Sequence, residues 1–328
     1  MTKKILVVSP NWLGDVVMAM PAVRRLLRER PGDSVSVLCR PAFACLWRAV
    51  AGVGGVVELA KEASATLGAG RLLRSLRFDE ALILPNSFRS AVAPFLARTP
   101  RRRGTGSHAR WLLVNDVVRF SAAEERLHQT LEYSKILCGT AECDFSDTGF
   151  RPSPDGAVEG LDRSPRPLVG IVPGAARGPS KRWPGFAEAA RLVAEALPGV
   201  RFAVFGGKGE ERDCEETAAA VGAANYCSRT NLAQFASSLA ACDAVLCNDS
   251  GGMHLASAAG TPVVAVFGAT DPEKTGPIGR GAVVVRAQGV KASRAVGRED
   301  PAAIAALRSV PPSAVAEAAI RVLRGGAG

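Results

Sequence analysis

The chain has 328 residues, of which 47% are hydrophobic and 22% charged, and this is typical of a folded protein long enough for two domains. Its net charge is +10, but aromatic residues make up only 5%, so we expect no base-stacking surface and no nucleic-acid partner. No run approaches the ~18 apolar residues of a membrane span, and the first apolar stretch is too short for a signal peptide, so we expect a cytoplasmic protein.

Short apolar runs alternate with helical patterns through the first half of the chain. The apolar runs predict strands at 5–9, 34–39, 56–59 and 81–85. Apolar residues at helical spacing predict helices at about 15–30, 42–49 and 66–76. This alternation is typical of a parallel sheet with crossover helices, so we expect residues 1–150 to form a first Rossmann-like domain.

A segment rich in proline and glycine, 151–167, interrupts this pattern and is the predicted linker. After it the alternation restarts, with strands predicted at 168–173, 201–206, 244–247 and 262–268. Helices are predicted at 184–196, 210–220, 232–240 and 252–259. We therefore expect an α/β protein with a second Rossmann-like domain at 168–328. Because ligands of open α/β sheets gather at the carboxyl ends of strands, a site is expected in a cleft across which the two domains face each other.

The stretch "NDSGGMH", Asn248 to His254, follows a predicted strand and precedes a predicted helix. Its glycines permit close approach of the backbone to a ligand, and the N–H groups at the start of the helix suit a phosphate. The alternative is that Asp249 or Ser250 only caps the helix, while His254 bonds a neighbouring carbonyl. The stretch by itself does not decide between these two interpretations.

Two further strand-to-helix loops carry charged residues. "PGAARGPSKRWP" contains Lys181 and Arg182, and a cation here would neutralise a leaving phosphate. In the first loop Asp15 follows Gly14 at a helix start, where the helix dipole favours an ionised carboxylate that can accept a proton. Simple N-terminal capping is the alternative, and taken alone it is the favoured one. The loops contain neither a Walker motif nor Gly-x-Gly-x-x-Gly, which argues against an ATPase and an NAD enzyme.

Metal-binding motifs are missing from the sequence. There is no Asp-x-Asp or His-x-x-x-His pattern, and the eight cysteines include no Cys-x-x-Cys pair. We therefore expect no catalytic metal, no structural zinc, no disulfide and no cofactor.

Positive charge is concentrated between Arg71 and Arg110. Nine arginines in this segment stand against two acidic residues, which leaves a net charge of +7. A run of this kind usually forms a solvated face. The functional alternative is a surface for an anionic partner, which would be a phosphorylated glycolipid, an anionic membrane or nucleic acid.

Taken together, these segments resemble the ADP-heptose:lipopolysaccharide heptosyltransferases, glycosyltransferase family 9, and most closely the heptosyltransferase II members. The resemblance covers nearly the whole chain and is carried in order by "ILVVSPNWLGDVVMAMP", "LPNSFRSAVAPFLA", "PRRRGTGSHARWLLVNDV", "PGAARGPSKRWP", "FGGKGEER" and "CNDSGGMHLASAAGTPVVAVFGATDP". It implies the GT-B architecture, in which the first Rossmann-like domain binds the acceptor and the second binds the nucleotide sugar. It also implies inverting transfer of L-glycero-D-manno-heptose from an ADP-heptose donor to a heptose of the lipopolysaccharide inner core.

The resemblance further implies roles for single residues. Asp15 matches the proposed general base of the family. On the donor side the matching residues are Lys181, Glu210, Thr230, Asp249, Ser250, Gly251, Gly252 and His254. Among them, Lys181 matches a lysine at the donor phosphate, Glu210 an acidic residue at the ribose hydroxyls, and Thr230 a backbone contact to adenine. On the acceptor side the expected residues are Asn11, Arg89, Arg101, Arg102 and Arg103.

Some features of the chain depart from this pattern. Heptosyltransferase I carries hydroxyl residues near the phosphates where this chain has Ala176 and Arg177, and the segment 289–310 has no assignable role. The difference at Ala176 and Arg177 favours heptosyltransferase II. The alternative within the family is another family 9 transferase with a different acceptor, such as heptosyltransferase I or a later-core enzyme. The other is a non-catalytic protein that binds anionic glycans or nucleic acid. Because the implied acceptor is a glycolipid, peripheral contact with the inner face of the cytoplasmic membrane is also expected.

Overall fold

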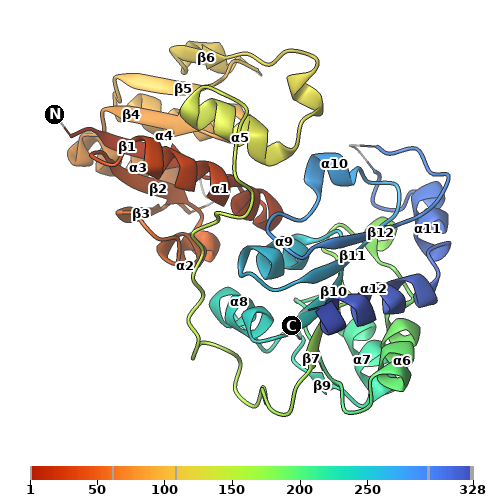
Figure 1. The fold of residues 1–328 in the computed structure, drawn as a ribbon. Helices are drawn as coiled ribbons and strands as arrows, with labels where there is room; N and C mark the ends of the chain where they lie inside the picture. Colours follow the sequence, from red (N-terminus) through yellow and green to blue (C-terminus); the bar gives the residue numbers. More distant parts are fainter. Residues whose placement is uncertain (1, 61–62, 108, 294–295, 326–328) are drawn as a thin grey trace. The chain divides into compact units, whose positions relative to one another are not determined.

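The computed structural model describes residues 2–60, 63–107, 109–293 and 296–325, and the chain folds into two compact units. The N-terminal unit is Met1–Arg151 and the C-terminal unit is Pro152–Gly328 (Figure 1). Most of the segment predicted as a linker packs on the C-terminal unit. There the Val158 side chain is buried, and the Val158 N–H donates to Ser238 Oγ at 2.9 Å. Among the described residues, no helix is both long enough and apolar enough to span a membrane.

The N-terminal unit is built on a six-stranded parallel sheet with the strand order β3-β2-β1-β4-β5-β6. Its strands are β1 (Lys4–Val8), β2 (Ser34–Cys39), β3 (Gly55–Glu58), β4 (Glu80–Ile83), β5 (Arg101–Thr105) and β6 (Asp116–Val118). Its helices are α1 (Leu13–Glu29), α2 (Ala44–Arg48), α3 (Ala63–Leu76), α4 (Phe88–Leu96) and α5 (Gln129–Cys138). Short 3-10 turns are η1 (Pro41–Phe43), η2 (Arg110–Leu112) and η3 (Glu124–Arg126).

Helices cover both faces of this sheet because its central strands are apolar on both sides. Leu6 and Val8 of β1 face a core that includes Leu73 of α3 and Ala91 of α4. Helix α1 connects β1 to β2, toward one edge of the sheet, and α3 connects β3 to β4, toward the other edge. Because such crossovers are right-handed, the two helices lie on opposite faces of the sheet. In Figure 1, α1 and α5 pack together in front of the sheet, and α3 and α4 lie behind it.

The C-terminal unit repeats this design with the strand order β12-β11-β10-β7-β8-β9. Its strands are β7 (Leu168–Val172), β8 (Arg201–Val204), β9 (Ala224–Asn225), β10 (Ala244–Asn248), β11 (Val263–Phe267) and β12 (Val283–Arg286). Its helices are α6 (Phe186–Ala196), α7 (Glu211–Val221), α8 (Leu232–Ala240), α9 (Gly251–Ala258), α10 (Pro272–Thr275), α11 (Pro301–Arg308) and α12 (Pro312–Gly325), with the 3-10 turn η4 (Pro179–Lys181). Strands β7, β10 and β11 are buried along their whole length, which explains their continuous apolar runs.

The predicted α/β fold with two Rossmann-like units is confirmed. Strand β2 and helix α8 have the predicted bounds, whereas the helix predicted at 42–49 is a 3-10 turn followed by the short α2. The sequence did not predict strand β5, because its residues, Arg-Arg-Arg-Gly-Thr, show no alternation of apolar and polar side chains. It also did not predict α4, α5, β6, β9, β12 and the helices α10 to α12.

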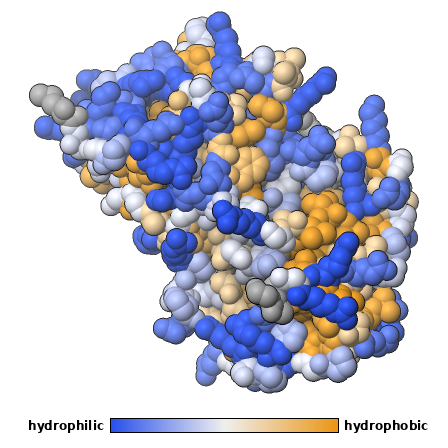
Figure 2. Space-filling view, viewed as in Figure 1, coloured by the Kyte–Doolittle hydropathy of each residue, from blue (hydrophilic) through white to orange (hydrophobic). Residues whose placement is uncertain are grey.

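Apolar residues on the face shown in Figure 2 gather on the C-terminal unit around α11 and α12. These two helices are rich in alanine, and the larger side chains Ile320 and Leu323 are partly buried against the core. Exposed large apolar side chains among the described residues instead lie almost all in the N-terminal unit.

Candidate active site

Two strand-to-helix loops of the C-terminal unit are joined by Asn248. This residue ends β10 and is fully buried. Its Nδ2 donates to the Pro173 carbonyl at 2.7 Å, and its Oδ1 accepts from the Trp183 N–H at 3.0 Å. Pro173 and Trp183 flank the loop after β7, so one amide side chain holds this loop against the end of β10. The sequence motifs assigned no role to Asn248, although a polar amide at the end of an apolar strand marks it as a candidate.

Lys181 and Asp249 form an ion pair between the same two loops. Lys181 ends η4, and Asp249 directly follows β10. The Lys181 Nζ lies 2.5 Å from Asp249 Oδ2, and the two side chains are 15% and 7% exposed. Because the pair is shielded from water, its attraction is stronger than that of a surface ion pair. The structure therefore brings together two residues that the sequence placed on the donor side.

Helix α9 begins directly after this ion pair. Ser250 occupies the N-cap position without a side-chain capping bond, and its buried Oγ has no hydrogen-bond partner among the residues that the structure describes. Gly251 and Gly252 form the start of the helix, where N–H groups have no intrahelical partner. His254 is buried in the same turn. Ser250 therefore does not serve as a simple side-chain cap, and the start of the helix suits an anion.

Glu210 lies at the start of α7 and packs against the loop that carries Lys181. Its Oε2 accepts from the Gly207 N–H at 2.8 Å. Its carboxyl group covers Gly174, where a Cβ would lie 2.2 Å from Glu210 Cδ, so a larger residue at this position would displace the Glu210 carboxylate. Burial raises the pKa of Glu210. Thr230 is half-buried in the loop before α8.

The segment 289–310, to which the sequence assigned no role, contacts the Lys181 loop. The Ser180 N–H donates to the Arg298 carbonyl at 3.2 Å, and α11 packs against η4. The Arg298 side chain lies over Gly178, where a Cβ would be 2.7 Å from Arg298 Cγ. Gly178 also has a φ of +93°, which favours glycine. The Arg298 segment therefore supports the turn that positions Lys181.

Asp15 lies half-buried in the first turn of α1, in the N-terminal unit. The hydroxyl of Tyr133 on α5 donates to Asp15 Oδ1 at 3.2 Å. Burial, together with the nearby Asp15 charge, raises the pKa of Tyr133 well above its ordinary value, so the phenol stays protonated and donates. The sequence carried no signal for Tyr133, which is 118 residues from Asp15. Asn11 is half-buried in the loop before α1.

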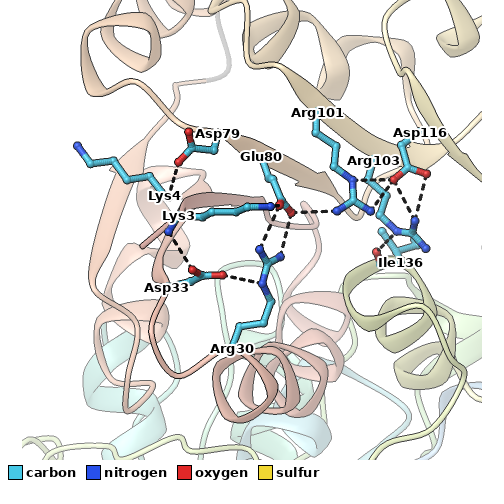
Figure 3. Close-up of polar contacts among 10 residues, drawn as sticks. All are labelled: Lys3, Lys4, Arg30, Asp33, Asp79, Glu80, Arg101, Arg103, Asp116 and Ile136. Carbon is cyan, nitrogen blue, oxygen red and sulfur yellow. Dashed lines mark hydrogen bonds and ion pairs between the residues drawn. The ribbon is translucent and has the colours of Figure 1, made fainter. Parts of the chain in front are cut away.

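Arg101 and Arg103 are paired with carboxylates of the same unit, although the Arg101 side chain is still 45% exposed. The parallel register sets Arg101 opposite Glu80 and Arg103 opposite Asp116. Figure 3 shows both guanidinium groups turned toward Asp116, and Arg101 also contacts Glu80 at 3.3 Å. Their role in acceptor binding stays a prediction, but both side chains already have acidic partners.

Arg102 and Arg89 differ in their surroundings. Arg102 donates to the carbonyls of Leu113 and Thr99 at 2.7 and 2.5 Å, and its guanidinium lies 5.5 Å from the Phe95 ring centroid. Arg89 is exposed in the first turn of α4. The guanidinium groups of Arg101, Arg102 and Arg103 thus all have partners within the N-terminal unit.

Glu80 is the centre of an ion cluster at the start of β4. Its carboxylate is buried and contacts Lys3 and Arg30 at 2.8 and 2.9 Å in addition to Arg101 (Figure 3). The hydrogen bonds from Arg30 are the main reason that the pKa of Glu80 falls to about 2. The cluster lies at the amino ends of the strands, so it belongs to the scaffold.

Arg110 is the buried arginine of the basic segment. It is completely buried, and its Nη1 donates to Thr105 Oγ1 at 2.7 Å. Its Nε and Nη2 have no hydrogen-bond partner in the described parts of the chain, and burial lowers its pKa to about 10. Arg110 follows β5 at the carboxyl edge of the sheet, the edge at which Asp15 follows β1. A buried cation with unused donors at this edge suits an anionic ligand group.

No group of three or more His, Cys, Asp or Glu residues that could hold a metal ion occurs in the described ranges. Residues 67–304 match the model of glycosyltransferase family 9 (heptosyltransferase). Lipopolysaccharide heptosyltransferase 2 of Salmonella typhimurium is 31% identical to this chain, and that of Escherichia coli is 30% identical. Each alignment covers 86% of this chain and 88% of the relative.

The solved structure of Escherichia coli ADP-heptose LPS heptosyltransferase II matches with a TM-score of 0.82 at 28% identity, over 99% of this chain and 100% of that one. This match confirms the predicted GT-B fold. The resemblance found in the sequence is thereby also confirmed. The chain belongs to glycosyltransferase family 9, the heptosyltransferases.

Proposed function

We propose that this enzyme transfers L-glycero-D-manno-heptose from ADP-heptose to a heptose of the lipopolysaccharide inner core, with inversion at the anomeric carbon. The names of the relatives and of the matching structure support this donor and this class of acceptor. The observation that carries the proposal is the Lys181–Asp249 pair at the start of α9. It combines a shielded cation with helix N–H groups, which is what a nucleotide diphosphate requires.

The C-terminal unit binds the donor in this proposal. Lys181 and the N–H groups of Gly251 and Gly252 meet the charge that develops on the departing ADP. Glu210 accepts hydrogen bonds from the ribose hydroxyls, and the backbone at Thr230 contacts adenine. The unused Oγ of Ser250 supports this arrangement, because a buried hydroxyl without a protein partner is available to a ligand.

The N-terminal unit binds the acceptor and supplies the base. Asp15 accepts the proton of the attacking acceptor hydroxyl, and Tyr133 holds its carboxylate in place. Arg110 is proposed to meet an anionic group of the acceptor, together with Asn11 and Arg89. Arg101, Arg102 and Arg103 contribute less directly, since their guanidinium groups already have partners.

The glycolipid acceptor places the proposed reaction at the inner face of the cytoplasmic membrane, where the enzyme would be a peripheral protein. Lys181 and the helix N–H groups neutralise the leaving ADP in this mechanism, so no metal or cofactor has a role in it.

A transfer assay with defined acceptors tests the proposal. The enzyme is mixed with ADP-heptose and with truncated lipopolysaccharides that either carry or lack a first heptose, and ADP release and product mass are measured. We expect release only with the acceptor that already carries a heptose. Transfer to the heptose-free acceptor would assign the chain to the heptosyltransferase I activity. No ADP release with any acceptor would overturn the proposal in favour of a non-catalytic binding protein.

A further inference from the structure

Apart from Arg89, which is exposed on α4, the arginines of the basic segment divide into two groups. Arg101, Arg102, Arg103 and Arg110 have partners or are buried within the N-terminal unit. A second group is exposed, and within the described ranges these side chains make no hydrogen bond or ion pair: Arg71, Arg74, Arg77 and Arg98. The positive charge available to a partner is therefore concentrated on α3 and at the end of α4, a distribution that the count of arginines in the sequence did not show.

Exposed apolar side chains are interleaved with these four arginines. Ala69 and Leu73 of α3 are buried against the sheet. On the solvent side of α3, Leu67 lies one helical turn from Arg71. Leu72 and Leu76 are also exposed, at 48% and 37%, and they lie one turn apart.

Helix α4 extends the same surface. A Cβ on Gly70 of α3 would lie only 2.8 Å from Leu96 Cβ, so the two helices pack closely side by side. Leu96 and the neighbouring Phe95 are 37% and 42% exposed. Lys4 adds a further cation, because its Nζ donates to the carbonyl of Leu76 at the end of α3.

We propose that this α3–α4 surface docks the enzyme on an anionic lipid membrane. It is defined by Leu67, Leu72, Leu76, Phe95 and Leu96 with Arg71, Arg74, Arg77 and Arg98. Leucine and phenylalanine side chains enter the boundary between headgroups and acyl chains, while the long arginine side chains reach the phosphates around them. The cationic charge matches an anionic leaflet, which draws basic segments toward it.

The position of this surface is compatible with catalysis. Arg77 and Arg98 lie just before β4 and β5, at the amino ends of the strands. Asp15 follows β1 at the opposite, carboxyl edge of the sheet. A membrane on the α3–α4 surface therefore leaves the edge with Asp15 open to a glycolipid from the same leaflet. The access of a glycolipid to Asp15 rests on the proposed function, whereas docking on the membrane does not.

Vesicle sedimentation tests the docking surface. The full chain is mixed with vesicles of phosphatidylglycerol and phosphatidylethanolamine, or with vesicles of phosphatidylcholine alone. We expect binding to the anionic vesicles, weakened by salt, and little binding to the neutral ones. Replacing Arg71, Arg74, Arg77 and Arg98 by Gln should weaken binding at least about 100-fold. Leu67→Ser with Leu72→Ser should weaken the binding that remains at high salt, because that part is apolar.

A matched control distinguishes the effect of the α3–α4 surface on vesicle binding from the effect of the net charge of the protein. Changing four exposed arginines of the C-terminal unit to Gln, at 280, 308, 321 and 324, removes the same charge and should leave vesicle binding near the wild-type level. Equal loss in both quadruple variants, or normal binding by the α3–α4 variant, would overturn the proposal. So would wild-type binding to duplex RNA but not to anionic vesicles.

Turnover of a lipid-free acceptor distinguishes this proposal from the proposed function. The α3–α4 variant should keep wild-type kcat and KM with a soluble truncated acceptor, and a folded circular dichroism spectrum. It should lose activity only when the acceptor is embedded in anionic vesicles. If the wild-type protein binds vesicles but releases no ADP with any acceptor, the proposed function fails while the docking surface stands.

Discussion

The ammonium group of Lys181 lies 2.5 Å from the carboxylate of Asp249, and each residue belongs to a different strand-to-helix loop. Each charge of the pair neutralises the other, and a bound diphosphate would share the ammonium group of Lys181 with Asp249. Asp249 therefore keeps the ammonium group at the start of α9, where the helix N–H groups converge.

Replacing Lys181 by Ala should weaken donor binding and slow transfer together, because the charge acts in both the ground state and the transition state. Loss of the cation also leaves Asp249 buried without its partner. Steady-state kinetics should show a higher KM for ADP-heptose and a kcat lower by roughly 10²-fold. Arg321→Ala removes an exposed cation of the same unit and should change neither value. An unchanged KM for ADP-heptose in the Lys181→Ala enzyme would remove Lys181 from the donor site.

Replacing Asp15 by Asn tests the general base. The amide nearly preserves the shape of the side chain but cannot accept the proton of the acceptor hydroxyl. We expect kcat to fall by roughly 10²–10⁴-fold, while the affinity for ADP-heptose changes little. Rapid-quench transfer assays and donor titration measure the two effects separately. A variant with near-normal kcat would show that Asp15 only stabilises the N-terminus of α1 and is not the general base.

Tyr133→Phe tests the hydrogen bond that orients Asp15. The phenol stabilises the ionised carboxylate, so its loss should move the acid limb of the kcat profile to higher pH and lower kcat by about tenfold. Tyr226→Phe is the matched control, because it removes a buried hydroxyl in the other unit, where Tyr226 donates to the Gly160 carbonyl. A pH profile that keeps its shape in Tyr133→Phe would mean that Tyr133 only fills the core.

Chelation tests the proposed neutralisation of the leaving ADP by protein groups. Because Lys181 and the start of α9 supply the positive charge, transfer should persist in EDTA at the rate measured before chelation. Complete loss of activity, restored by magnesium or manganese, would assign this task to a metal ion instead.

Glu80→Gln tests the ion cluster as a stabiliser of the N-terminal unit. The pKa of Glu80 is lowered from 4.5 to about 2 in the fold, so ionised Glu80 stabilises the protein above about pH 4.5. That stabilisation is lost as the pH falls toward 2. At pH 7 the free energy of unfolding should fall by about 2 kcal/mol, less than for a fully buried pair, since Lys3 and Arg101 are about half-exposed and screened by solvent.

Urea unfolding at pH 7 and at pH 3 measures this difference. The difference in the free energy of unfolding between wild type and Glu80→Gln should be smaller at pH 3 than at pH 7. Glu58→Gln is the control, because Glu58 and its partner Arg48 are both exposed, and it should change the free energy of unfolding by less than about 1 kcal/mol. If this difference did not depend on pH, the charge of Glu80 would not be what stabilises the unit.

The sequence by itself determined the two α/β units and their strand-to-helix loops. Apolar runs and helical spacing are local signals, so β2, β7, β10 and α8 could be predicted from neighbouring residues alone. Asp15, Lys181 and the stretch that contains Asp249 could be found as candidates because polar residues at strand ends follow a general rule of parallel sheets.

Only the tertiary structure decided which of these residues meet. Tyr133 reaches Asp15 across 118 residues of chain, and Lys181 reaches Asp249 across 68. Such contacts depend on strand order and on how far each loop extends, and neither is encoded in a local pattern. The basic segment shows this most clearly. A count of charges does not show in which direction each arginine side chain points. The strand register places Arg101 and Arg103 opposite carboxylates, and the helix periodicity leaves Arg71 facing solvent.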